Sequence, residues 1–145
     1  MRGEKFLIFK LRTMGNGGSP PVLGNRVFEK PRNDERVTPL GSVLRKLSVD
    51  ELPQLFNVLR GDMSLVGPRP LLLRDMDRFP PGRPMRRFEV KPGITGLWQV
   101  SGRSLLSDEE RIRLDIEYAE RWNLWLDIEI LLRTPMAVIT GRGAF

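Results

Sequence analysis

The segment Leu47–Ser64 reads LSVDELPQLFNVLRGDMS and places two adjacent acids, Asp50 and Glu51, shortly before a proline. Its apolar residues recur at helical spacing, which predicts an amphipathic helix. Two interpretations of the acids follow. Either Ser48 and Glu51 form a capping box at the start of that helix, or both acids precede the helix and are available for chemistry.

Pro53 weighs against the capping box. With Ser48 as the cap, the proline would be the fifth residue of the helix, where a backbone N–H is needed as a donor. Proline also disfavours helical dihedrals at Leu52, so we expect Leu52 or a near neighbour as the cap and Pro53 as the first helical residue. A kinked helix running from Arg36 through Pro53 is the alternative. Either geometry leaves the acids beside backbone N–H groups that favour carboxylates and can hold a phosphate.

Composition narrows the chemistry further. The chain has 145 residues, 40% of them hydrophobic, which suits one domain, and its net charge of +6 suits polyanions, phosphate esters or anionic membranes. It has no cysteine and no histidine. Disulfides, thiolate metal sites and cysteine catalysis are therefore excluded, and acid-base or nucleophilic work falls to carboxylates, lysine or tyrosine. No window reaches the roughly 18 apolar residues of a membrane-spanning helix.

The segments before Leu47 predict a strand, a loop and a helix. Phe6 to Met14 is apolar with charges at alternate positions, which favours a short strand, and residues 15–25 are rich in glycine and proline. Arg36 to Ser48 predicts a short helix with Thr38 as its cap and Pro39 opening it.

The segments after Ser64 are interrupted by glycine and proline up to Pro70. A turn at Pro92-Gly93 is expected to lead into a strand through Trp98 and Val100. Ser107 to Glu110 is a capping-box sequence, S-x-x-E, which predicts a helix to about Trp122. The final apolar segment, WNLWLDIEILLRTPMAVITG, suits either a core helix or one lying in a membrane interface with its indoles at headgroup level.

Basic residues near the two acids point to phosphate chemistry. Arg45 lies just upstream, and Arg69 stands between two prolines in VGPRP, which would hold its guanidinium in a fixed direction for bidentate phosphate contact. A solvated loop residue is the alternative for Arg69. Carboxylates, arginine and a magnesium ion form a coherent set for phosphoryl transfer.

Several motifs carry a family resemblance. In order they are FKLRTM, DERVTPLG, LRKLSVDELPQLFNVLRGDMSLVGPRPL, VKPGITGLWQVSGR and RLDIEYAERWNLWLDIEILLRT. Together they resemble the bacterial sugar transferase family, the monotopic polyprenyl-phosphate hexose-1-phosphate transferases, from about Phe6 to Thr134. The pattern and the resemblance predict an α+β fold: one mostly helical domain over residues 1–145, with short β-strands and amphipathic membrane-surface helices.

The resemblance implies a reaction and roles for the acids. Family members transfer a sugar 1-phosphate from a UDP-sugar to undecaprenyl phosphate and release UMP, the first membrane step of bacterial glycoconjugate assembly. They form a covalent phosphosugar intermediate on the aspartate of an Asp-Glu pair. By this pattern Asp50 is the nucleophile and Glu51 supports Mg²⁺.

The resemblance also implies five substrate-binding or phosphate-binding residues. Lys10, Arg45 and Arg69 match positions around the family's active site, Asp115 matches a recurring polar position, and Arg103 is a further candidate. The alternative for Asp115 is a helix-surface acid paired with Arg111 at i,i+4.

The expected location is the cytoplasmic face of the bacterial inner membrane, with UDP-sugar, polyprenyl phosphate and the membrane surface as partners. Family members carry an N-terminal membrane helix ahead of the motif that appears here as Gly3 to Phe6, and this sequence starts where that helix would end. Two other hypotheses remain open. One is a non-catalytic domain that binds nucleotide or membrane. The other is a basic nucleic-acid-binding module, which rests on charge alone, so we expect no nucleic-acid partner.

Overall fold

Two three-residue strands form the centre of the structure. In the computed structural model, which describes residues 5–15, 34–72 and 84–140, β1 (Ser64–Val66) pairs in parallel with β2 (Gly93–Thr95), with Ser64 opposite Gly93. The backbone of Gly67 lies so close to Gly93 that a β-carbon there would collide with the Gly67 nitrogen. Glycine at this position therefore allows the two segments to meet.

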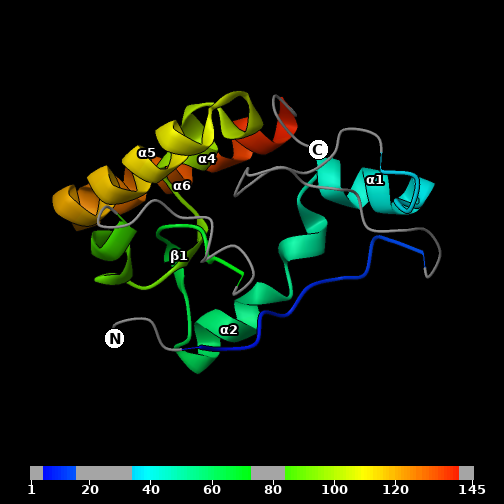
Figure 1. Cartoon of the computed structure of the whole chain (residues 1–145), viewed down its shortest axis with the longest axis horizontal. Helices are drawn as coiled ribbons and strands as arrows, with labels where there is room; N and C mark the ends of the chain where they lie inside the picture. Colours follow the sequence, from blue (N-terminus) through cyan, green and yellow to red (C-terminus); the bar gives the residue numbers. More distant parts are fainter. Residues whose placement is uncertain (1–4, 16–33, 73–83, 141–145) are drawn as a thin grey trace.

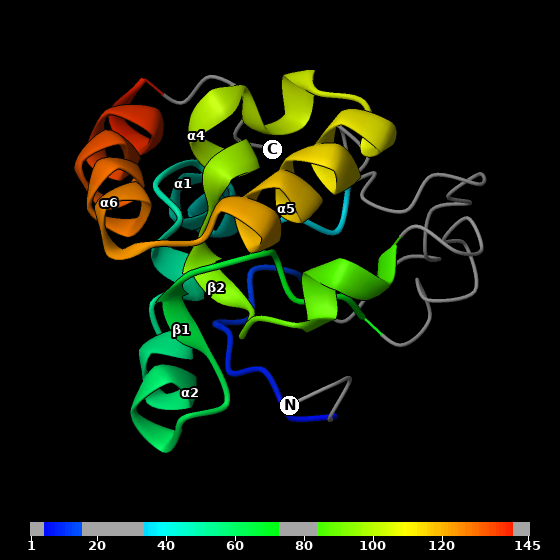
Figure 2. The same ribbon diagram turned by 90° about the vertical axis from the view of Figure 1, so that its left-hand side faces the viewer.

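Helices surround this sheet, which confirms the predicted mostly helical α+β class. In chain order the helical elements are α1 (Pro39–Lys46), η1 (Val49–Glu51), α2 (Gln54–Arg60), η2 (Pro84–Phe88), α4 (Leu97–Ser101), η3 (Arg103–Leu105), α5 (Asp108–Arg121) and α6 (Leu124–Ile139). Figures 1 and 2 show α4, α5 and α6 grouped on one side of the strands and α2 on the opposite side. The turn that carries the two acids lies between α1 and α2.

The core lies between β1 and the last two helices. Val66, Tyr118 and Ile130 pack together there, and Ile130 is fully buried. The Tyr118 hydroxyl lies 3.2 Å from the carbonyl oxygen of Val66 and 2.7 Å from Asp127 Oδ1. This hydroxyl therefore ties α5 to both β1 and α6.

The helix caps predicted at Thr38 and Ser107 are confirmed. The Thr38 hydroxyl accepts a hydrogen bond from the Gly41 N–H at 2.9 Å, and Pro39 opens α1. Ser107 and Glu110 form both bonds of the capping box at the start of α5. These caps depend on residues three apart in sequence, so local sequence suffices to find them.

The predicted strand over Phe6–Met14 is wrong. Residues 5–13 form neither helix nor strand, and Met14 forms one isolated antiparallel bridge with Val37. The backbone of this segment bonds instead to the side chain of Asn57 and to the carbonyl of Asp50. The loop predicted over residues 15–25 falls, beyond Gly15, outside the described residues.

The predicted strand through Trp98 and Val100 is also wrong. The strand after the Pro92-Gly93 turn ends at Thr95, and both residues belong to α4. Gly96 has an extended backbone with φ −167° and serves as the N-cap of that helix. The change from strand to helix within four residues is too short for alternation in the sequence to resolve.

The turn at Ser48 decides between the interpretations of the acids. Ser48 has a left-handed backbone with φ 56°, which ends α1 and excludes a kinked helix continuing through Pro53. Its side chain makes no capping hydrogen bond, so the capping box at Ser48 is wrong. The helix α2 starts at Gln54 with Pro53 as its N-cap, one residue later than predicted. Both acids precede α2, as expected.

The final helix, α6, continues past Pro135 to Ile139 and leaves much of its apolar surface exposed. Trp125, Leu132 and Ile139 are 79%, 76% and 77% exposed, whereas Ile130 is buried. The helix therefore packs one side against the core and presents other apolar side chains to solvent. No helix in the described residues is long and apolar enough to cross a membrane.

Candidate active site

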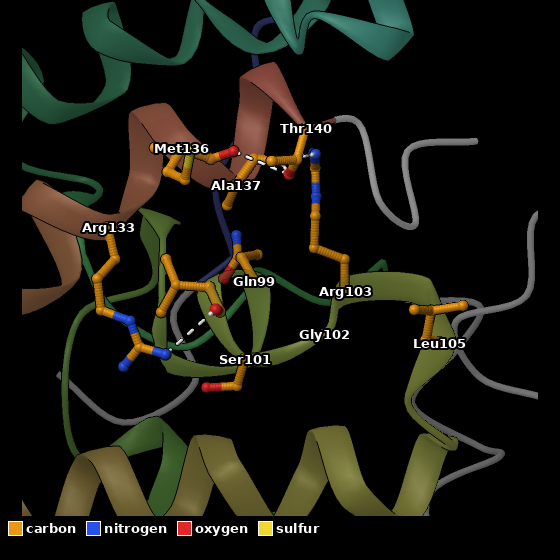
Figure 3. A pocket seen from close by; sticks show the side chains of 10 residues that line it. Gln99, Ser101, Gly102, Arg103, Leu105, Arg133, Met136, Ala137 and Thr140 are labelled. Atoms are coloured by element: carbon orange, nitrogen blue, oxygen red, sulfur yellow. Dashed lines mark hydrogen bonds between the residues drawn. The ribbon is translucent and has the colours of Figure 1, made fainter.

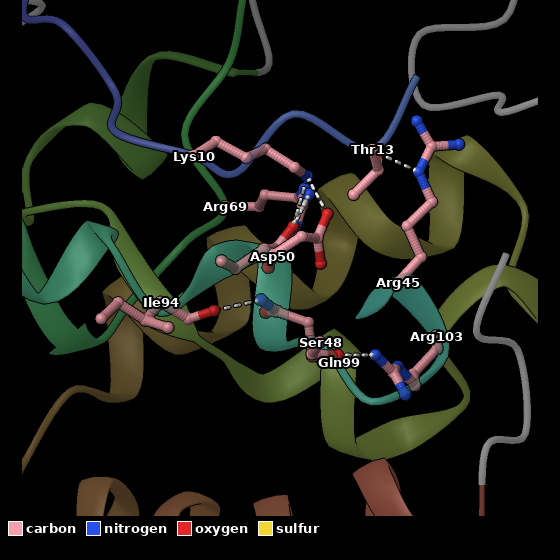
Figure 4. Close-up of polar contacts among 10 residues, drawn as sticks. Lys10, Thr13, Arg45, Ser48, Asp50, Arg69, Ile94, Gln99 and Arg103 are labelled. Atoms are coloured by element: carbon pink, nitrogen blue, oxygen red, sulfur yellow. Dashed lines mark hydrogen bonds and ion pairs between the residues drawn. The ribbon is translucent and has the colours of Figure 1, made fainter. Parts of the chain in front are cut away.

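Asp50 and Glu51 lie on η1, the short turn between α1 and α2. Asp50 is only 2% exposed, and its carbonyl oxygen accepts a hydrogen bond from the N–H of Leu11 at 3.0 Å. The N-terminal segment therefore lies directly against the acids. Figure 4 shows Lys10 and Arg69 approaching the Asp50 turn from the same side.

Lys10 contacts both acids. Its Nζ lies 2.9 Å from Asp50 Oδ2 and 3.2 Å from Glu51 Oε1. The lysine side chain is 33% exposed, while the carboxylate of Asp50 is 3% exposed. One cation thus bridges the pair from the solvent side and reduces the repulsion between the two carboxylates.

Asn57 holds the segment that delivers Lys10. This fully buried side chain of α2 accepts from the Phe9 N–H at 3.1 Å and donates to the Leu7 carbonyl at 2.7 Å. It satisfies backbone groups that would otherwise need a neighbouring strand. Sequence reasoning missed Asn57, although a polar residue within the apolar run LFNVL was an available signal.

Arg69 also contacts Glu51. Its Nη2 lies 2.6 Å from Glu51 Oε1 and its Nη1 3.3 Å from Oε2, which is a bidentate contact. The guanidinium also lies 6.0 Å from the ring centroid of Trp98. The charge of Glu51 raises the pKa of Arg69 above its ordinary value. The solvated-loop alternative for Arg69 is therefore excluded.

A buried ion pair lies behind Arg69. The Arg87 guanidinium donates to the carbonyl oxygen of Arg69, and its Nη2 lies 2.7 Å from Asp115 Oδ2, with both side chains 1% exposed. Burial raises the pKa of Asp115 to about 7, even though Arg87 favours its charged form. Burial lowers the pKa of Arg87.

This ion pair corrects one interpretation of Asp115 and adds a residue that the sequence did not reveal. The surface-acid alternative is wrong, because Asp115 is buried. It forms an ion pair with Arg87, behind the loop that carries Arg69. Sequence reasoning missed Arg87, because two arginines before an aromatic residue carry no signal of burial.

Arg45 and Arg103 lie at the edge of the site. Arg45 Nε donates to Thr13 Oγ1 at 2.9 Å, on the N-terminal segment. Arg103 Nη2 donates to Ser48 Oγ at 2.9 Å and Nη1 to the Ala137 carbonyl of α6 at 3.1 Å. The structure thus places Lys10 and Arg69 on the acids, and Arg45 and Arg103 on the segments that flank them.

The negative charges of Asp50 and Glu51 are neutralised by Lys10 and Arg69 in the absence of substrate. An arriving diphosphate offers new acceptors to Lys10 and Arg69, and this exchange would free carboxylate oxygens of Asp50 and Glu51. Asp50 Oδ2 is buried and, despite its ion pair, lacks a hydrogen bond of good geometry. The site thus places two carboxylates in contact with two basic side chains of the kind that bind phosphate oxygens.

The acids also fit magnesium in one specific way. Among the residues that the structure describes, no group of three or more histidine, cysteine or acidic side chains is arranged to hold a metal. Mg²⁺ is commonly bound by one or two carboxylates together with substrate phosphates and water. Asp50 and Glu51 match that mode and do not form a cage that would hold the ion by themselves.

A family profile described as bacterial sugar transferase matches residues 1–141, which is nearly the whole chain. The chain belongs to the bacterial sugar transferase family. The resemblance seen in the ordered motifs is thereby confirmed.

Relatives of this bacterial sugar transferase include proteins with named reactions. It is 43% identical to the UDP-glucose:undecaprenyl-phosphate glucose-1-phosphate transferase of Caulobacter vibrioides, over 99% of this chain and 55% of that protein. It is 48% identical to the undecaprenyl-phosphate galactose phosphotransferase of Salmonella typhimurium, over 80% of this chain and 24% of that protein. The uncharacterized sugar transferase EpsL of Bacillus subtilis is 44% identical, over 99% of this chain and 67% of that protein.

The chain spans only part of many relatives: 26%, 24% and 32% of the lengths of matched proteins from Streptococcus agalactiae, Erwinia amylovora and Haemophilus influenzae. The activity of these longer relatives as whole proteins is therefore not assigned to this chain by similarity alone.

Proposed function

We propose that this chain is the catalytic part of a phosphoglycosyl transferase that moves a sugar 1-phosphate from a UDP-sugar to a polyprenyl phosphate. The contacts of Lys10 with both Asp50 and Glu51, and of Arg69 with Glu51, carry the proposal. Relatives named for transfer to undecaprenyl phosphate support the substrate classes. The absence of histidine and cysteine from the sequence suits a reaction in which no proton must be transferred.

In the first step, a carboxylate oxygen of Asp50 attacks the phosphorus that carries the sugar. A new P–O bond forms to Asp50 while the bond from this phosphorus to the bridging oxygen breaks, and UMP leaves with the electron pair. Arg69 would bind the diphosphate through its guanidinium and stabilise the charge that develops on the leaving group. Lys10 would shift from the acids to the phosphates, which exposes the nucleophile.

In the second step, a phosphate oxygen of the polyprenyl phosphate attacks the same phosphorus. The bond to Asp50 breaks and returns the electron pair to its carboxylate, so the enzyme is regenerated and the lipid carries a diphosphate-linked sugar. One carboxylate thus serves two displacements, each favoured by placement and charge neutralisation more than by proton transfer.

Magnesium is part of the proposal. Glu51, with Asp50 beside it, would hold the ion together with phosphate oxygens of the donor. When bound, Mg²⁺ supplies charge neutralisation at the diphosphate. Titration of the chain with Mg²⁺ in the presence of a UDP-sugar tests this role, and equal donor affinity with and without the ion would contradict it.

Two matched substitutions test the nucleophile. Incubation with a panel of UDP-sugars should give UMP and a sugar-phosphate adduct that survives denaturation, read by mass spectrometry. Asp50→Asn should lose the adduct and at least about 10³-fold in UMP release, because the covalent route is removed. Glu51→Gln should slow adduct formation and still allow it. Glu109→Gln, an exposed acid on α5 away from the cluster, is the control. Undiminished turnover by Asp50→Asn would overturn the assignment.

We also propose that the chain binds the surface of an anionic membrane, on the cytoplasmic side of the bacterial inner membrane. The exposed Trp125, Leu132 and Ile139 of α6 offer apolar contact, and the net charge of +6 favours anionic headgroups. Flotation with anionic liposomes tests it, since a chain that stays at the bottom of the gradient contradicts it. That nucleic acid is not a partner stays a prediction, tested by binding to DNA and RNA at low salt.

A further inference from the structure

A pocket of about 410 Å³ lies between the C-terminal half of α6 and the segment that joins α4 to η3. Its volume falls within the range of roughly 300–1,000 Å³ typical of small-molecule sites. Met136, Ala137 and Leu105 contribute apolar lining, and Arg103 and Arg133 also line it. Figure 3 shows the two arginines on opposite sides of the pocket. Apolar walls and two guanidinium groups suit a ligand that is both apolar and anionic.

Arg103 is the better placed of the two cations. It donates hydrogen bonds to two neutral oxygens, the hydroxyl of Ser48 and the carbonyl of Ala137. Arg103 is partly buried, and an anionic ligand would offset the cost of withdrawing its charge from water. Arg133 Nη1 lies 3.2 Å from Glu129 Oε1, and the Arg133 side chain is 46% exposed.

The pocket adjoins the acids through the same arginine. Ser48, the partner of Arg103, stands two residues before Asp50 and has the left-handed backbone that ends α1. Arg69 approaches the acids from the Lys10 side, and Arg103 contacts their turn at Ser48. Two phosphate groups could therefore approach this turn at separate places.

Apolar surface continues outward from the pocket along α6. Met136 forms part of the pocket lining and is 65% exposed, and its neighbours Leu132 and Ile139 are 76% and 77% exposed. A hydrocarbon chain that leaves the pocket can therefore stay on apolar side chains. A nucleotide sugar has no such chain, so this surface suits an isoprenoid.

We propose that the pocket lined by Arg103, Met136 and Ala137 binds the polyprenyl phosphate acceptor, with its phosphate facing Arg103 and its first isoprene units on α6. This inference rests on the proposed function and assigns its two substrates to separate places. Arg69 binds the donor diphosphate, and the pocket binds the acceptor. In the second displacement, the acceptor's phosphate oxygen forms the new P–O bond as the bond to Asp50 breaks, and Arg103 stabilises the phosphate that attacks.

Filling the pocket tests this division. Ala137→Leu should leave the single burst of UMP released without acceptor within about twofold of the original chain. Transfer from the preformed adduct to polyprenyl phosphate should fall at least tenfold. Ala119→Leu, the same change on α5 outside the pocket, should affect neither step. Equal transfer by Ala137→Leu and the original chain would overturn the proposal.

A second variant keeps the test decisive if Ala137→Leu loses its thermal transition. Arg133→Gln changes an exposed side chain at the same pocket and should raise the acceptor KM at least threefold while leaving the UMP burst unchanged. An unchanged acceptor KM in that variant would overturn the proposal.

Direct binding separates failure of the pocket from failure of the proposed function. Farnesyl phosphate, a short isoprenoid phosphate, should bind the original chain and should bind Ala137→Leu or Arg133→Gln at least tenfold and threefold more weakly, respectively. Farnesol and inorganic phosphate should each bind more weakly than farnesyl phosphate. Equal binding of inorganic phosphate would overturn an isoprenoid site. Farnesyl phosphate binding without any UMP burst would support the pocket and contradict the proposed reaction.

Discussion

The acids and helix α6 distribute their side chains in opposite ways. Around the acids, charge is buried: Asp50 and Asp115 are 2% and 1% exposed. On α6, apolar groups are exposed: Trp125 and Leu132 are 79% and 76% exposed. A buried charge persists only with partners at defined positions, whereas an exposed apolar surface requires no partner geometry. We infer that the first region fixes reacting groups and the second offers contact to lipid.

The largest effect is expected from removing the guanidinium that contacts Glu51. Arg69→Gln should reduce UMP release by about 10²–10³-fold, because it removes a bidentate contact and a donor to the developing charge. The measurement is the initial rate of UMP release at saturating UDP-sugar. Arg60→Gln, whose side chain is 66% exposed, is the matched control and should change the rate less than twofold. A rate for Arg69→Gln within threefold of the original would refute the assignment.

Variants of the buried Arg87–Asp115 pair distinguish a contribution to stability from a role in positioning Arg69. Asp115→Leu alone should cost about 3–5 kcal/mol in urea unfolding, because it leaves Arg87 buried without its carboxylate. Arg87→Met with Asp115→Leu should restore most of that stability. Its UMP release should still be reduced by roughly tenfold, because the carbonyl of Arg69 has lost its donor and the guanidinium is less well placed.

Tyr118→Phe provides the control for this pair. It removes another buried hydrogen bond, to Asp127, without touching Arg69. It should lower the unfolding free energy by about 1–3 kcal/mol and leave UMP release by the folded chain unchanged. Full activity in the double variant would mean that Arg87 contributes only to stability.

Substitutions on α6 should weaken membrane binding and leave UMP release unchanged. Trp125→Ser with Leu132→Ser should leave the UMP burst within twofold and weaken liposome binding by about 10–100-fold, because each side chain loses its apolar burial in lipid. Flotation and tryptophan fluorescence measure the binding. Leu7→Ser alters a leucine that is 84% exposed on the N-terminal segment and should leave binding unchanged. Equal losses in both variants would deny α6 a specific role.

The unfolding free energy should also depend on pH through Asp115. Because burial raises the pKa of Asp115 from 3.8 to about 7, the folded chain holds this proton more tightly than the unfolded chain. The unfolding free energy should therefore decrease as pH rises through this window, by up to about 1.4 kcal/mol per pH unit, and the decrease should end above pH 7. The Arg87→Met, Asp115→Leu variant should lack this contribution in urea titrations. Identical slopes would contradict it.

Local sequence sufficed for some elements and not for others. Thr38-Pro39 and the Ser107–Glu110 capping box specify helix starts through contacts of three residues or fewer, and both predictions are confirmed. The strand over Phe6–Met14 failed because its backbone bonds to Asn57, about 50 residues away. No periodicity reports such a partner.

The site residues also differ in whether the sequence could reveal them. Lys10, Asp50, Glu51 and Arg69 were expected together from the ordered motifs, and the structure brings them into contact. Arg87 was missed and Asp115 was open to a surface interpretation, because both depend on burial created by the packing of α5 on η2. Such burial is set by tertiary packing, and the sequence around Arg87 and Asp115 contains no pattern that predicts it.

The bonds between Asn57 and the N-terminal segment have a kinetic consequence. They join residues 48 and 50 positions apart, and the bond between Arg103 and Ser48 spans 55. Contacts this distant form late, because the intervening chain must first lose its freedom. During refolding from urea, helical circular dichroism should therefore recover before the ability to release UMP. Enzymatic competence would be the last property that the chain regains.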